Sequence, residues 1–124
     1  MHLSRLAGFI IDCRTADLDA AASFWGGALG LGILGDDGPK YVRLDAAAHA
    51  LSIEVQQVEH ESRVHLDIET DNVDAEVQRL ESLGAARHLQ GARWWVMQAP
   101  TGQRFCVVQT RVDLSTLAGV TRWP

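Results

Sequence analysis

The sequence predicts an α+β protein made of two tandem βαβββ modules, and three observations support this prediction. Residues 64–69 alternate apolar and polar side chains, as a half-buried strand does. Apolar residues then follow at helical spacing from Val73 to Leu83, and Gly84 supplies a C-terminal stop. The same pattern occurs earlier in the chain at a constant offset, because Ile10, Asp12, Asp19 and Ala20 correspond to His65, Asp67, Asp74 and Ala75. The chain therefore reads as a duplicated unit.

The composition limits the class of protein. The 124 residues, 47% of them hydrophobic, fit one domain over residues 1–124, and the net charge of −5 without a basic stripe argues against a nucleic-acid partner. Cys13 and Cys106 are isolated, which favours a reduced, cytoplasmic setting. The N-terminus lacks a signal-peptide pattern, and no apolar run is long enough to cross a bilayer. We therefore expect no membrane partner.

The predicted elements of the first module, residues 6–56, follow in the order strand, helix and three strands. Asp17 caps a helix that carries Trp25 on its apolar face. The glycines at residues 26–32 come at the end of this helix, so we interpret them as a helix terminus and not as a phosphate-binding loop, whose glycines precede a helix. The predicted strands are Phe9 to Arg14, Ile33 to Leu34, Tyr41 to Leu44 and Leu51 to Val55.

A polar linker, residues 57–63, separates the two modules. The second module, residues 64–109, begins with the strand that contains His65, with Val64, Leu66 and Ile68 expected on its buried face. Its helix is capped by Asp71 or Asn72. The predicted later strands are Arg87 to Leu89, Arg93 to Gln98 and Arg104 to Gln109. In the C-terminal tail, residues 110–124, the only predicted element is a turn of helix at Leu114 to Leu117.

This duplicated unit resembles the vicinal oxygen chelate superfamily, which includes glyoxalase I, bleomycin-resistance proteins, extradiol dioxygenases and methylmalonyl-CoA epimerase. Three features carry the resemblance: residues 16–21 after the first strand, His65 at the start of the second module, and residues 99–102 before the last strand. The resemblance implies a curled mixed β-sheet cup with helices on its outer face, a small-molecule ligand inside the cup, and a homodimer.

The resemblance also implies four cup-facing positions, two in each module, which hold His or Glu in metal-dependent members. In this chain they are Ile10, Glu54, His65 and Cys106. Ile10 cannot bind a metal, and Glu54 with His65 alone falls short of the three protein ligands that catalytic metals usually have. Cys106 could complete a Glu54, His65 and Cys106 site, for which zinc would be the best match. The expected cofactor is thus either none or a divalent metal.

Other residues of the predicted site indicate which kinds of small molecule it could bind. Glu54 and His65 are the candidates for acid–base catalysis, and Asp12 and Asp67 add carboxylates to the polar strand faces. Trp94 and Trp95 are adjacent on a strand, so only one of them can line the cup. A tryptophan beside acidic groups suits a cationic or aromatic ligand, although both tryptophans could simply fill the core.

Three functions remain open from the sequence. The leading one is a binding protein, similar to bleomycin-resistance proteins, which holds a small organic ligand in the cup without the full metal site. The second is a metal-dependent lyase or isomerase of the glyoxalase kind that uses Glu54 and His65. The third is a metal-free enzyme in which one of these two residues acts as the acid–base catalyst. The sequence leaves the ligand unidentified.

Overall fold

The computed structural model describes residues 1–124 and shows an α+β protein, which confirms the predicted fold class. Contacts divide the chain into two compact units. One is Gly8–His65, and the other is Leu66–Pro124 together with Met1–Ala7; we call them the Gly8–His65 unit and the Leu66–Pro124 unit. The elements are β1 (His2–Arg14), α1 (Leu18–Leu29), β2 (Ile33–Asp36), β3 (Tyr41–Leu44), β4 (Ser52–Val58), β5 (Arg63–Thr70), α2 (Val73–Ser82), β6 (Ala86–Gln90), β7 (Trp94–Gln98), β8 (Arg104–Gln109) and β9 (Thr121–Trp123), with short 3₁₀ helices at Ala47–His49 and Leu114–Thr116.

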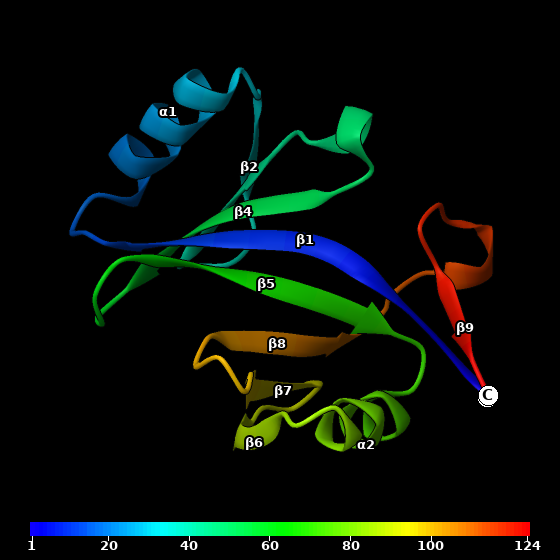
Figure 1. Ribbon diagram of the computed structural model, residues 1–124. Coiled ribbons are helices and arrows are strands. Elements are labelled where there is room, and N and C mark those ends of the chain that lie inside the picture. Colours follow the sequence, from blue (N-terminus) through cyan, green and yellow to red (C-terminus); the bar gives the residue numbers. More distant parts are fainter. The chain divides into compact units, whose positions relative to one another are not determined.

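In the Gly8–His65 unit, strand β1 pairs in parallel with β4, and β3 and β2 follow as antiparallel neighbours. Helix α1 packs against β2, β3 and β4, as Figure 1 shows. Ile11, Leu44, Ile53 and Val55 form the buried core on the helix side. Because side chains alternate along a strand, the residues between these apolar positions lie on the opposite sheet face.

The two ends of helix α1 follow the predicted capping chemistry. The Asp17 carboxylate accepts the backbone N–H of Ala20 at 3.0 Å, so the predicted N-cap is confirmed. Gly30 ends the helix in the left-handed conformation, with φ of 69°, which a residue without a Cβ adopts readily. Gly26 and Gly27 lie inside the last turns of the helix. The glycine run therefore ends a helix, as the sequence predicts.

The Leu66–Pro124 unit has the same strand order. Strand β5 pairs in parallel with β8, which pairs antiparallel with β7, and β7 with β6. Helix α2 contacts β6, β7 and β8, as seen in the lower part of Figure 1. Asn72, and not Asp71, caps this helix by accepting the N–H of Ala75 at 3.1 Å. The core between helix and strands contains Val77, Leu80, Met97 and Val107.

Several predicted element boundaries need correction. Strand β1 begins at His2 and not at Phe9, and its first residues pair antiparallel with β9, a strand of the tail that the sequence does not predict. Strand β2 extends two residues beyond Leu34. Strand β4 continues to Val58, into the predicted linker, because the Gln57 backbone N–H donates to Lys40 O at 2.8 Å and its side chain donates to Thr15 O at 2.7 Å.

The expected burial of strand β5 is wrong for two of its three apolar residues. Val64 and Leu66 are 58% and 52% exposed. Only Ile68 packs against the core beneath helix α2. The main strand contacts of helix α2 are with β6, β7 and β8, so the strand pattern of β5 alone does not decide which of its side chains are buried. The alternating pattern identified the strand correctly but not the covered face.

Neither helix combines the length and the apolar character needed to span a membrane.

Candidate acid–base site

The central feature of the candidate site is a hydrogen bond between Asp12 on β1 and His65 on β5, both in the Gly8–His65 unit. His65 Nδ1 lies 2.7 Å from Asp12 Oδ2. Asp12 is 3% exposed, and the imidazole is 15% exposed. A carboxylate accepts only, so Nδ1 carries the proton in this pair, and neutral His65 then has its lone pair on Nε2. Asp12 therefore orients the imidazole and selects its tautomer.

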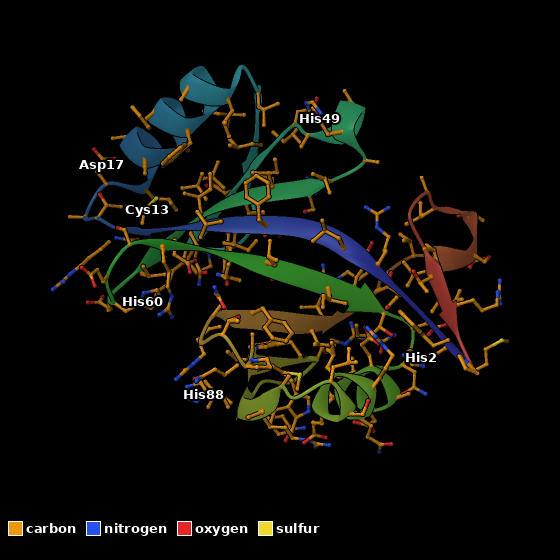
Figure 2. All side chains as sticks on the ribbon, in the orientation of Figure 1. His2, Cys13, Asp17, His49, His60 and His88 are labelled. Carbon is orange, nitrogen blue, oxygen red and sulfur yellow. The ribbon has the colours of Figure 1, made fainter.

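Two further basic side chains approach the same carboxylate oxygen. Arg63 Nε is 3.9 Å and His60 Nε2 is 4.0 Å from Asp12 Oδ2. Arg63 also donates to His60 Nε2 at 3.3 Å, and His60 Nδ1 donates to Glu61 O at 2.8 Å. Figure 2 shows His60 at the loop between β4 and β5. A buried carboxylate requires compensation, and the guanidinium of Arg63, the first residue of β5, supplies a positive charge near Asp12. His60 Nε2 accepts from Arg63, so His60 positions the guanidinium and does not donate to the carboxylate.

The other carboxylate oxygen of Asp12 has no partner. Asp12 Oδ1 is buried and has no hydrogen-bond partner in the structure. Buried polar atoms are nearly always hydrogen-bonded in native proteins, so an orphaned acceptor calls for an explanation. A donor group of a bound molecule would satisfy it.

Glu54 lies on the same sheet face as Asp12, in the next row of side chains. In the register of the sheet, Glu54 on β4 is opposite Ile10 on β1 and Arg43 on β3. The adjacent row contains Asp12, Gln56 and Tyr41. The neighbours of Glu54 along its strand, Ile53 and Val55, are buried on the helix side. Glu54 itself is half-buried on the opposite face, which we call the polar face of the Gly8–His65 unit.

The remaining predicted site residues belong to the Leu66–Pro124 unit. Asp67 and Cys106 are opposite each other on the parallel strands β5 and β8, and both are half-buried. Trp95 packs into the core beneath helix α2, while Trp94 is 43% exposed. Ile10, Asp12, Glu54 and His65 therefore belong to one unit, where Asp12 and His65 are hydrogen-bonded, and Asp67, Trp94, Trp95 and Cys106 belong to the other.

Sequence reasoning missed three residues of the polar face and its rim. His60 and Arg63 fall in the segment predicted as a linker, where no periodicity marks them. Arg43 could have been found, because the strand Tyr41–Leu44 alternates polar and apolar residues, and Val42 and Leu44 are buried. Arg43 makes no hydrogen bond or ion pair, so its guanidinium is an available cation beside Glu54.

Solved structures share this fold. A methylmalonyl-CoA epimerase from Mycobacterium tuberculosis superposes with a TM-score of 0.60 and 18% identity, covering 90% of this chain and 91% of the other. A glyoxalase/bleomycin resistance protein/dioxygenase superfamily member from Vibrio splendidus gives 0.52 and 15%, covering 82% and 96%. The Mn(II)-bound glyoxalase from Novosphingobium aromaticivorans gives 0.60 and 20%, but 86% of this chain spans only 40% of that longer protein. No curated protein sequence matches the chain.

The strand order of the units and these structural neighbours define the class of fold, which this chain shares with the glyoxalase and the methylmalonyl-CoA epimerase above. A family comparison makes the assignment more specific. The chain belongs to the glyoxalase-like domain family, whose profile matches residues 8–108. The resemblance inferred from the sequence is thereby confirmed. At these low identities the neighbours show the fold alone, and the chemistry of this chain has to be argued from its own residues.

Proposed function

We propose that this protein binds a small organic molecule on the polar face of the Gly8–His65 unit and does so without a complete metal site. The hydrogen bond between Asp12 and His65 carries the proposal, because it holds a titratable ring in one orientation and one tautomer. The orphaned Asp12 Oδ1 adds an acceptor, and the unpaired Arg43 adds a cation on the same face. A few placed polar groups above a packed apolar layer are typical of ligand sites.

The donor set of this unit does not fit a divalent metal by itself. At the superfamily positions within the unit, Glu54 offers a carboxylate and His65 an imidazole, but Ile10 offers only a buried hydrocarbon. Catalytic metals usually take three protein ligands. A metal would therefore need a ligand from the other unit, for which Cys106 is the residue that the sequence predicts. The metal-dependent lyase remains the less supported alternative, with zinc its best match if that thiolate participates.

A metal-free acid–base enzyme is the second candidate, and the same hydrogen bond favours it. A histidine oriented by a buried carboxylate accepts a proton at Nε2, and the carboxylate stabilises the resulting imidazolium. Glu54, on the same face, would be the second proton-transfer group. In this reading Asp12 is a positioning residue, since it acts through His65.

Ligand screening by two-dimensional NMR tests the binding proposal. We expect some members of a broad panel of small organic molecules to shift the amide signals of β1, β4 and β5. His65→Ala and Asp12→Asn should lower the affinity of the protein for these ligands. His88→Ala and Asp19→Asn are matched controls, because both residues are exposed and make no side-chain hydrogen bond (His88, Figure 2). Signals that move only outside the polar face, or equal binding in all four variants, would refute the site.

Exchange of ligand C–H protons with D₂O separates the enzyme from the binder. An acid–base enzyme exchanges an acidic carbon-bound proton of its ligand, and Glu54→Gln or His65→Ala abolishes the exchange. A binding protein retains the ligand protons. Asp12→Asn should shift the pH profile of exchange, which a purely structural role would leave unchanged.

The homodimer implied by the superfamily resemblance is also a proposal. Ile33 and Leu34 are more than half exposed on the edge strand β2, and a second copy would cover such an edge. Light scattering coupled to size-exclusion chromatography tests it. A mass of one chain at all concentrations would contradict it.

A further inference from the structure

A cavity lies entirely within the Leu66–Pro124 unit, and the proposed function does not use it. It has a volume of about 270 Å³ and is bounded by the start of helix α2, the turn between β6 and β7, and the end of β8. This volume lies just below the range that drug-sized ligands fill, so only a small molecule fits the cavity. Trp94 and Trp95 line it together with Asp74 and Arg93, and Gln90 and Gln109 contribute amides.

The wall formed by Trp94 depends on Gly91. A Cβ added to Gly91 would lie 2.0 Å from Trp94 Cε2 and 2.2 Å from Cζ2, so the indole rests directly on the glycine backbone. The turn is closed by the Gly91 N–H, which donates to Trp94 O at 2.9 Å. One face of the indole is therefore covered by the turn. The ring remains 43% exposed and offers a flat surface for stacking.

Two opposite charges border the same cavity without pairing. Neither Asp74 nor Arg93 makes a side-chain hydrogen bond or an ion pair, and the charge of Asp74 acts on Arg87 without direct contact. Other charged residues of the unit do pair: Arg79 binds Glu76, and Arg87 binds Glu81. The cavity thus presents one available carboxylate and one available guanidinium beside an aromatic surface. A ligand with a single charge would leave one of the two unmatched.

We infer that this cavity binds a small zwitterion that carries a flat apolar group, such as a free aromatic amino acid. The ammonium group of the ligand pairs with Asp74, its carboxylate with Arg93, and its ring stacks on Trp94. The amide oxygen of Gln109 is an additional acceptor, because its Nε2 donates to Asp71 O at 3.3 Å and leaves Oε1 available. The cavity is lined by no residue of the Gly8–His65 unit.

Four probes of similar shape test the charge requirement. L-phenylalanine carries both charges, and 3-phenylpropanamide carries neither. Phenethylamine carries the ammonium group alone, and 3-phenylpropionate carries the carboxylate alone. The readout is the set of indole N–H signals in two-dimensional NMR, since each of the 4 tryptophans gives one signal. We expect L-phenylalanine to bind about tenfold more tightly than either singly charged probe, which corresponds to one charge-assisted hydrogen bond. The signals of Trp94 and Trp95 should move, and those of Trp25 and Trp123 should not.

Variants separate the two charges. Asp74→Asn should lower the affinity for L-phenylalanine and phenethylamine about tenfold and leave 3-phenylpropionate unchanged. Arg93→Gln should lower the affinity for L-phenylalanine and 3-phenylpropionate about tenfold and leave phenethylamine unchanged. Gly91→Ala, which displaces the Trp94 indole, should weaken all four probes. Asp19→Asn and Arg111→Gln are the matched controls, because both residues are exposed and lie outside the cavity.

Three results would overturn the inference: no movement of the Trp94 signal at millimolar probe, equal affinities for all four probes, or equal shifts at Trp25 and Trp123. None of them bears on the polar face of the Gly8–His65 unit, whose ligands are read from the amide signals of β1 and β4. Failure of this inference and failure of the proposed function are therefore distinguishable.

Discussion

Glu76 accepts two hydrogen bonds from Arg79, at 2.7 and 2.9 Å, although the Glu76 side chain is fully buried. His2 Nε2 lies 2.9 Å from the same carboxylate, and Figure 2 places His2 beside helix α2. Burial alone would raise the pKa of the Glu76 carboxyl. The hydrogen bonds from Arg79, His2 and Ser4 outweigh that effect and hold the pKa below its ordinary value of 4.5.

This arrangement predicts a pH-dependent contribution to stability. A carboxyl group whose pKa is lower in the folded state stabilises the protein above its unfolded pKa, and this stabilisation is lost as the pH falls through the folded pKa. Glu76→Gln should therefore cost about 3 kcal/mol of unfolding free energy at neutral pH, because it leaves the partly buried Arg79 guanidinium without its charged partner. The difference from wild type should shrink as the pH falls below 4.5. Urea denaturation at several pH values measures both effects.

Glu81→Gln is the control for this experiment. Glu81 lies on the same helix and binds Arg87 at 3.0 Å, but both side chains are 39% exposed. Exposed ion pairs contribute less than about 1 kcal/mol, so this variant should be nearly neutral at every pH. A loss in Glu76→Gln that is equally large in acid would show that the charge of Glu76 is not its cause.

A second prediction concerns the close approach of strands β1 and β4. A Cβ at Gly8 would lie 1.8 Å from Ser52 O, a backbone atom that cannot move without disturbing the sheet. Gly8→Ala should therefore destabilise the protein by about 2–3 kcal/mol, as overpacking typically does. Gly27→Ala is the matched control: Gly27 lies in helix α1, and a Cβ there meets nothing within 4 Å. Alanine is the better helix former, so this variant should gain up to about 1 kcal/mol. Thermal unfolding of both variants tests the contrast.

Local patterns made much of the fold predictable from the sequence. Period-2 alternation located most strands, and the cap at Asp17 and the stop at Gly30 bounded helix α1. The same patterns did not show which face of β5 is covered, because that depends on where helix α2 packs, and Val64 and Leu66 are exposed. Strand β9 is three residues long and depends on pairing with distant β1, which no local pattern reports.

The candidate site was predictable only in its parts. The repeat alignment placed Glu54 and His65 at superfamily positions, and alternation placed Asp12 on a polar strand face. It could not show that Asp12 and His65 are hydrogen-bonded, because their contact depends on tertiary packing between residues far apart in the sequence. Nor could it show that Arg63, at the start of β5, and His60, in the loop before it, approach the same carboxylate.

The chemistry of Cys13 gives a third prediction. Burial raises the pKa of the Cys13 thiol above its ordinary value of 9.0, and the nearby Asp12 carboxylate adds to this effect, while a hydrogen bond with Trp25 opposes it. Only the thiolate is nucleophilic, so Cys13 should react slowly with Ellman's reagent at neutral pH. Cys106→Ser leaves Cys13 as the only thiol, and its reaction rate should keep rising above pH 9. The same variant in guanidinium chloride should react like an ordinary thiol; fast reaction of the folded form at neutral pH would contradict the prediction.

The last prediction concerns the metal. Glu54 and His65 are the only two metal-binding side chains at the superfamily positions of the Gly8–His65 unit, and Ile10 replaces the third ligand with hydrocarbon. Two ligands hold a divalent ion weakly. We therefore expect purified protein, after chelation and reloading with zinc or manganese, to contain far less than one equivalent of metal by elemental mass spectrometry. Glu54→Gln, His65→Ala and Cys106→Ser should not lower that content below the value for His88→Ala, the exposed control. A full equivalent in wild type that disappears in the first three variants and persists in the fourth would instead establish a Glu54, His65 and Cys106 site. That result would favour the lyase over the binding protein, because a bound metal ion supplies the Lewis-acid stabilisation that such a reaction uses.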